Sequence, residues 1–211
     1  GHVALLKDLG AERRAKDARQ VFEACPKKCT LLYNTILDVC VDSGDLEAAE
    51  QVMARAVAED MVDAVTYNTI IKKHLQRGDF NAVRAAIETM KKAGGNLAPT
   101  CVTFNEFIDA AIRTSTKFAW DLVDEMKAFG LKPNGVTCSI LMKSAHGSSK
   151  CGGLERALTL MEGLEEPIDE VLVSSVCEAG VRANRADLLK RALRRVHSGA
   201  GRATVTGAHA F

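Results

Sequence analysis

The sequence predicts an all-α fold, an α-solenoid built from helix-turn-helix repeats of about 35 residues. A short pattern recurs along the chain, and its successive copies are 34, 37, 34 and 35 residues apart when counted on one polar residue. Units of this size bury their apolar faces only against neighbours, so a fixed period in this range indicates a stacked array. An aromatic content of only 5% also favours close helix packing over a β-sandwich or barrel. The polar residues that mark the copies, called the reading residues below, are Asn34, Asn68, Asn105, Ser139 and Ser174.

Residues 1–29 read as the end of one helix followed by a second helix, which is the second half of a partial repeat. Within 11–24, Ala15, Ala18, Val21 and Phe22 are spaced for one helix face. Cys25 precedes Pro26, and a residue before proline is disfavoured in the helical region, so we expect this helix to end there.

The first complete repeat shows how each unit is divided into two helices. Its first helix is expected to stop at Ser43-Gly44, where glycine supplies a left-handed cap, and Asp45 can cap the next helix. A Gly78-Asp79 step repeats this arrangement in the following unit. The predicted units cover 1–29 (partial), 30–63, 64–100, 101–134, 135–169 and 170–196 (degenerate), and the tail 197–211 is expected to be disordered.

Composition and motifs argue against several other classes of protein. The net charge of +1 is a weak argument against indiscriminate nucleic-acid binding. The seven cysteines are scattered, with only Cys25 and Cys29 close together, so we expect reduced thiols and neither a metal nor a cofactor. The glycine-rich stretch 147–153 has no Lys-Ser/Thr pair after its last glycine, as a phosphate-binding loop requires. No apolar run is long enough to span a membrane, no transit peptide is recognisable, and nothing looks catalytic.

The repeated motif resembles that of the pentatricopeptide repeat family. Residues 65–71, Val-Thr-Tyr-Asn-Thr-Ile-Ile, match the opening of the family's consensus. Residues 126–134, Met-Lys-Ala-Phe-Gly-Leu-Lys-Pro-Asn, match its end. The resemblance covers approximately residues 30–187. It implies a right-handed superhelix that holds single-stranded RNA in a mitochondrion or chloroplast, with one base per repeat.

The resemblance also implies roles for individual residues. Each reading residue would face a base together with the last residue of its unit, and these unit-end residues are Asp63, Thr100, Asn134 and Asp169. Asn34 with Asp63 would read uracil, Asn105 with Asn134 a pyrimidine, and Ser139 with Asp169 guanine, which gives the short pattern U-N-Y-G. Apolar residues would sandwich each base, and these sandwiching residues are Leu31, Val65, Val102, Val136 and Val171. Phosphate contacts would come from Lys72, Lys73, Arg113 and Lys143.

Each of these roles has an ordinary structural alternative. The asparagines can cap or pack their helices, and the lysines and arginine can be plain solvated side chains. Tyr33, Tyr67, Phe104 and Trp120 are expected in the core rather than as stacking platforms. Two functions remain open, namely an adaptor that binds organellar RNA and a scaffold in an organellar assembly such as a ribosome, where it would contact other proteins. The short array, balanced charge and eroded units favour the scaffold, whereas a basic concave face would favour the adaptor.

Overall fold

The computed structural model describes residues 1–143, 152–165, 168–182, 184–187, 190–191 and 194. Most helices in this part of the chain form a series of short pairs, and the described residues contain no strand. The chain divides into two compact units, Gly1–Thr103 and Phe104–Phe211, each of which is described by itself below. The predicted tail 197–211 and most of the glycine-rich stretch lie outside the described residues.

The first unit consists of helix pairs α1 (His2–Ala11) and α2 (Ala15–Ala24), α3 (Thr30–Asp42) and α4 (Leu46–Ala58), and α5 (Ala64–Gln76) and α6 (Phe80–Ala93). A short 3₁₀ helix, η1 (Gly95–Leu97), follows, and α7 (Cys101–Ile112) spans the boundary between the units. The second unit continues with α8 (Thr116–Ala128), α9 (Gly135–Lys143), α10 (Gly152–Glu162) and α11 (Glu170–Arg182).

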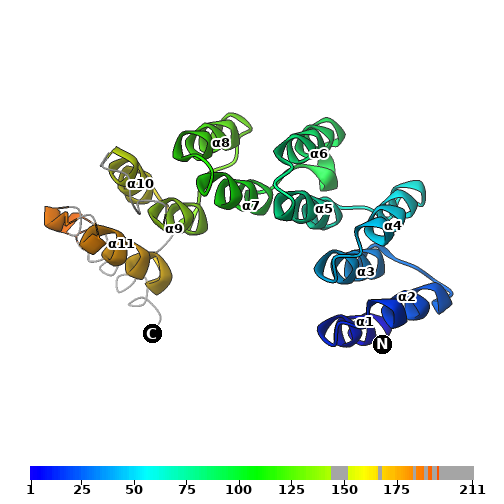
Figure 1. Cartoon of the computed structure of the whole chain (residues 1–211). Coiled ribbons are helices and arrows are strands. Elements are labelled where there is room, and N and C mark those ends of the chain that lie inside the picture. Colours follow the sequence, from blue (N-terminus) through cyan, green and yellow to red (C-terminus); the bar gives the residue numbers. More distant parts are fainter. Residues whose placement is uncertain (144–151, 166–167, 183, 188–189, 192–193, 195–211) are drawn as a thin grey trace, which may run out of the picture. The chain divides into compact units, whose positions relative to one another are not determined.

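The helices are arranged as two layers within each unit. The first helix of a pair packs against its own partner and against the first helix of the next pair, as in the contacts of α3 with α4 and α5 and of α9 with α10 and α11 (Figure 1). We call α1, α3, α5, α7, α9 and α11 the first helices, and α2, α4, α6, α8 and α10 the second helices. Residues 1–29, expected to form mainly one second helix, contain a first helix of ten residues as well.

The turns between paired helices follow the chemistry expected from the sequence. Gly44 and Gly78 adopt φ values of +77° and +70°, which are costly for residues with a Cβ atom. Asp45 and Asp79 then accept the N–H groups of Ala48 and Ala82 at 3.2 and 3.0 Å. The degenerate turn before α8 uses Ser115, whose Oγ accepts the Phe118 N–H at 3.3 Å. The second helices α4, α6 and α8 therefore start where a side-chain acceptor satisfies an otherwise unpaired N–H.

The core of the first unit lies around α3, where the side chains of residues 32–37 are all buried. Tyr33 packs edge-on against Phe22 of α2, with ring centroids 5.2 Å apart. Burial raises the pKa of the Tyr33 hydroxyl to about 12. Ala48 and Ala49 face this core from α4, and their small side chains allow close approach of the two helices. Tyr33, Phe104 and Trp120 are buried and Tyr67 is half-buried, as expected for core rather than stacking residues.

The cysteines of the described residues are free thiols, and several of them fill the core. Cys25, Cys40 and Cys138 are buried, and burial raises the pKa of the Cys40 thiol to about 11. A neutral thiol in this position acts as a small apolar side chain. Within the described chain, no group of His, Cys, Asp and Glu side chains is arranged to hold a metal ion. No described helix combines the length and apolar character needed to cross a membrane.

The closest packing of α1 against α3 depends on Gly10. A Cβ atom at this position would lie 2.6 Å from Cγ2 of Val39, a side chain that is stiff at χ1. We expect Gly10→Ala to lower the free energy of unfolding by about 1–3 kcal/mol, because overpacking outweighs the gain in helix propensity. Urea unfolding followed by circular dichroism would measure the change.

The matched control removes the Val39 side chain that the new Cβ atom would meet. In a Val39→Ala background the same Gly10→Ala substitution should become neutral or stabilising, since only the propensity gain of about 1 kcal/mol remains. An equal loss of stability in both backgrounds would contradict the assigned contact.

Candidate nucleic-acid interface

The reading residues lie in the first helices, near their amino ends, and they are not the residues that cap those helices. Asn34 and Asn105 are 8% and 7% exposed, and each lies four residues after the start of α3 or α7. The cap of α5 is Asp63, whose Oδ1 accepts the Thr66 N–H at 3.0 Å. Asn34 and Asn105 therefore do not cap their own helices. They take part instead in a side-chain bridge between consecutive repeats.

This bridge joins three residues where it is complete, and its best-defined example surrounds Asn34. Asn34 Nδ2 donates to Asp63 Oδ1 at 3.0 Å. Thr66 Oγ1 donates to Asn34 Oδ1 at 2.6 Å and accepts the Asp63 N–H at 3.0 Å. A capping box at the start of α5 and the amide of the preceding repeat thus form one hydrogen-bonded cluster, which we call the junction.

The second unit repeats the junction with one substitution. Asn105 Nδ2 donates to Asn134 Oδ1 at 3.2 Å, and Thr137 Oγ1 donates to Asn105 Oδ1 at 2.7 Å. Asn134 Oδ1 also accepts the Thr137 N–H at 3.1 Å. An asparagine amide therefore occupies the place of the Asp63 carboxylate without changing the pattern of bonds to its neighbours.

The remaining two junctions are incomplete. Thr103 Oγ1 donates to Asn68 Oδ1 at 2.7 Å and accepts the Thr100 N–H at 3.0 Å. Thr100, however, has a hydroxyl where the complete junctions have the carboxylate of Asp63 or the amide of Asn134. At the last boundary Asp169 Oδ1 accepts the Leu172 N–H at 2.8 Å. Leu172 stands where the earlier repeats have threonine, so the hydroxyl that would hold Ser139 is missing there. Ser174 is exposed.

The electrostatics of the first junction keep Asp63 ionised. Partial burial alone would raise the pKa of the Asp63 carboxyl, but hydrogen bonds from the Thr66 N–H and from Asn34 outweigh it and hold that pKa below its usual value. Asp63 is an acceptor at neutral pH as a result. Its Oδ1 takes the bonds from Thr66 and Asn34, which leaves acceptor capacity on Oδ2.

The sandwiching residues share an unusual exposure for apolar side chains. All of them are 55–63% exposed, and each belongs to the first turn of a first helix. They are Leu31, Val65, Val102, Val136 and Val171. Exposed apolar side chains that recur with the repeat period are available for contact with a flat partner.

The four basic residues expected to contact phosphate lie in different surroundings. Lys73 is 1% exposed, and its Nζ lies 2.7 Å from Glu50 Oε1 of α4, so it faces the inside of the repeat stack and is withdrawn as a phosphate contact. Lys72 Nζ lies 2.8 Å from Asp42 Oδ1 and 3.5 Å from Asp38 Oδ1. Arg113 pairs with Asp109, and Lys143 is exposed.

The charge of the first helices is mixed rather than basic. From α3 onward their described residues carry six carboxylates and four basic side chains. The carboxylates are Asp38, Asp42, Glu106, Asp109, Glu170 and Glu178, and the basic residues are Lys72, Lys73, Lys143 and Arg182. A basic face, the feature expected to favour RNA binding, is not present on these helices.

The functional residues that the sequence analysis missed are the junction threonines, Thr66, Thr103 and Thr137. Their signal was present, since each one lies two residues before a reading residue in consecutive copies of the pattern. All three are fully buried, and each holds a reading residue from the preceding repeat.

Comparison with known proteins agrees with this architecture. The pattern of the pentatricopeptide repeat domain matches residues 59–113, and the PPR repeat matches residues 31–60. The chain is 26% identical over 153 residues to the small ribosomal subunit protein mL103 (rPPR7) of Arabidopsis thaliana, covering 69% of this chain and 36% of that protein. A mitochondrial pentatricopeptide repeat-containing protein of the same plant is 28% identical over 170 residues, covering 78% of this chain and 29% of the relative. The chain therefore spans only about a third of these relatives.

Two solved structures share the fold. PPR10 of maize, crystallised with an 18-nt psaJ RNA element, superposes with a TM-score of 0.67 at 19% identity, covering 93% of this chain and 28% of PPR10. The PPR domain of Arabidopsis thaliana protein-only RNase P 1, crystallised with tRNA, gives a TM-score of 0.62 at 13% identity, covering 86% of this chain and all of that domain. The all-α solenoid class predicted from the sequence is confirmed, and residues 31–113 match the repeat patterns of the pentatricopeptide repeat family.

Proposed function

We propose that this chain binds single-stranded RNA along its first helices, with one base at each complete junction. The observation that carries the proposal is the junction itself, which holds a polar side chain near exposed apolar side chains and is complete at two of the four boundaries between repeats. PPR10 and the RNase P 1 domain, which share the fold, were crystallised with RNA and tRNA respectively. Each base would lie between the sandwiching residue of its own repeat and that of the next, as between Leu31 and Val65.

The choice of base follows from the atoms that the junction leaves available. At the first junction Asn34 keeps one Nδ2 hydrogen and Asp63 keeps an acceptor on Oδ2. One donor beside one acceptor complements uracil, which offers a carbonyl acceptor beside its N3–H donor. At the Asn105 junction, Asn134 places Nδ2 where Asp63 has Oδ2, so donors predominate. Two donors complement cytosine, which offers the N3 and O2 acceptors.

The other boundaries contribute less to the proposed pattern. Ser139 with Asp169 is assigned guanine, Asn68 with Thr100 is left unassigned, and the pattern remains U-N-Y-G. Lys72, Arg113 and Lys143 remain the proposed phosphate contacts, but the first two are paired with carboxylates. We therefore propose binding that relies on base contacts more than on phosphate, which gives a shallow dependence of affinity on salt.

A second candidate is a structural role in an organellar small ribosomal subunit. The mixed charge of the first helices favours it, as does the similarity to a protein named as a small ribosomal subunit component. The relative named as mitochondrial supports a proposed organellar location for either role. Neither role requires catalysis by this chain. Failure to bind RNA at any salt, with co-sedimentation on small ribosomal subunits in organellar extracts, would favour the scaffold.

Asp63→Asn tests base reading without removing the junction. Asn134 already occupies the equivalent place, so the variant should keep its cap and its bond to Asn34. We expect the base preferred at this position to change from uracil to cytosine. The ratio of the two affinities should change by roughly tenfold or more, because base discrimination by such contacts is about 1–3 kcal/mol. Fluorescence anisotropy with oligonucleotides that differ at one base would measure it.

Asn134→Asp is the reciprocal control, and it should move the preference of the other junction towards uracil. An equal loss of affinity for every oligonucleotide in both variants would contradict the reading role. These substitutions are sharper than Asn34→Ala, which would also leave the Thr66 hydroxyl without its partner.

The sandwiching role is tested by replacing Val65, Val102 and Val136 together with threonine. Threonine keeps the size and branching of valine, and all three sites are more than half exposed, so the melting temperature should change little. RNA affinity should fall at least tenfold, because each stacked base contributes about 1–3 kcal/mol. Unchanged affinity for a stable variant would remove these residues from the interface.

Asp42→Asn tests the proposed weakness of the phosphate contacts. The substitution removes the carboxylate nearest to Lys72 and leaves a neutral side chain of similar size. We expect tighter RNA binding and a steeper fall of log affinity with log salt, since Lys72 then neutralises a phosphate instead. A salt titration measures both effects, and a parallel Glu88→Gln variant on α6 is the control. Identical slopes in both variants and the wild type would show that Lys72 does not contact RNA.

A further inference from the structure

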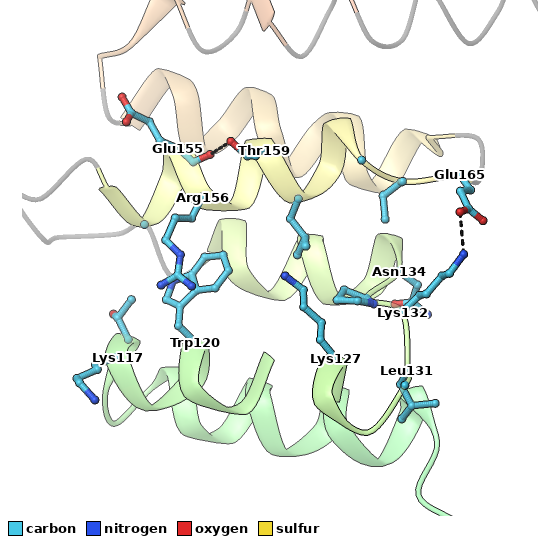
Figure 2. Close-up of a pocket in the computed structure, with 17 residues that line it drawn as sticks. Lys117, Trp120, Lys127, Leu131, Lys132, Asn134, Glu155, Arg156, Thr159 and Glu165 are labelled. Carbon is cyan, nitrogen blue, oxygen red and sulfur yellow. Dashed lines mark hydrogen bonds and ion pairs between the residues drawn. The ribbon is translucent and has the colours of Figure 1, made fainter. Parts of the chain in front are cut away.

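A groove between the second helices α8 and α10 shares only Asn134 with the proposed RNA interface. It has a volume of about 1560 Å³, compared with about 740 Å³ for the groove between α2 and α4. Its walls are α8 and α10, and the segment that leads from α8 to α9 closes one end (Figure 2). All of its lining residues lie in the second unit.

The lining combines apolar side chains with an excess of positive charge. Leu131, Leu160 and Leu164 contribute apolar surface, together with Trp120. Four cations and two carboxylates line the groove, so the lining carries two more positive charges than negative ones. The cations are Lys117, Lys127, Lys132 and Arg156, and the carboxylates are Glu155 and Glu165.

Lys127 is the cation that most clearly lacks a partner. Lys132 reaches Glu165 at 2.7 Å, and Lys117 reaches Asp121 at 2.9 Å. Figure 2 shows Lys127 extending from α8 toward α10 across the middle of the groove. Its ammonium forms no ion pair or hydrogen bond with any described residue. An anionic group in the groove would therefore meet an available cation beside apolar surface.

Arg156 forms one side of the same site. Its guanidinium lies over the Trp120 ring, 4.1 Å from the ring centroid, and only 3.6 Å from Asp124. Stacking fixes the plane of the guanidinium, and Asp124 is its ion-pair partner. A guanidinium has five N–H donors, which is more than one carboxylate accepts, so Arg156 can also bind a carboxylate of a ligand. Arg156 and Lys127 thus offer two kinds of cationic contact, one planar and one flexible.

We propose that this groove binds an acidic amphipathic segment of a partner protein, with its apolar residues against the leucines and its carboxylates on Lys127 and Arg156. The two helices that form the walls are 13 and 11 residues long, which gives a groove about 16–20 Å in length. A helical segment of three turns or so fits that length. This mode, an amphipathic helix laid in a groove, draws its affinity from apolar burial and its orientation from charge.

Protein fits this groove better than RNA for two reasons. Arg156 already covers the face of the Trp120 ring that a base would stack on. Glu155 and Glu165 in the lining, with Asp124 beside Arg156, would repel a backbone that carries a charge at every nucleotide. Carboxylates spaced along a peptide can meet the cations and avoid the acidic positions.

Trp120 is the single tryptophan of the chain, so its fluorescence reports directly on the groove. The probe is a synthetic helical peptide of about 14 residues with leucine along one face and glutamate on the other. The control probe has lysine in place of every glutamate, and a single-stranded RNA 12-mer is a third titrant. We expect a saturable change of Trp120 emission with the glutamate peptide only.

Lys127→Glu is the decisive variant, and Lys92→Glu on α6 is its matched control, because both side chains are exposed and undergo the same charge change. The first should weaken binding of the glutamate peptide at least tenfold, and the second should change it less than twofold. Circular dichroism would check that both variants remain folded. Equal weakening in both variants, equal binding of the lysine peptide, or displacement of the glutamate peptide by RNA would each overturn the proposal.

Discussion

The hydrogen bond from a buried threonine to the asparagine of the preceding repeat is the contact on which the proposed RNA interface depends. In the Thr66 and Thr137 junctions the hydroxyl donates to the asparagine Oδ1 while its oxygen accepts the N–H of the unit-end residue. The helix start and the orientation of the amide are therefore fixed by the same atom. Without it, a side-chain amide near the start of a helix would have several rotamers and hydrogen-bond partners available. The threonine thus extends the capping box, so that the same group also orients the side-chain amide of the asparagine.

This arrangement separates the part of the junction that holds the fold from the part that varies. Oδ1 of Asp63 and Oδ1 of Asn134 make equivalent bonds to the next helix and to the preceding asparagine. The two side chains differ only in their second polar atom, which is the acceptor Oδ2 in Asp63 and the donor Nδ2 in Asn134. A change in the base recognition that we propose would therefore require little change in packing. Leu172 illustrates the opposite case, because losing the threonine leaves Ser139 without its anchor whatever the unit-end residue is.

The sequence was sufficient to predict the repeats, the helix pairs and their caps, because these depend on local chemistry that recurs with a fixed period. The left-handed turn at Gly44 and the helix cap at Asp45 follow from such patterns. It was not sufficient for contacts between repeats. Lys72 and Lys73 are adjacent residues of the same type, so the sequence does not distinguish them. The rotation of about 100° between successive helical residues nevertheless places Lys73 inside the stack beside Glu50. The junction threonines were overlooked because a threonine in a helix has no distinctive role until its partner 32 or 35 residues away is known.

The distribution of charge connects the two proposed binding sites. The first helices carry paired or opposed charges, so attraction to phosphate adds little to base contacts there. The groove of α8 and α10 carries a cation without a partner, in a setting suited to carboxylates spaced along a peptide. A chain with few complete junctions gains only modest affinity for RNA from stacking and base edges. A second contact with a protein that is held near the same RNA would raise the effective concentration of each ligand at the other's site, so the proposed groove would add to the affinity supplied by the junctions.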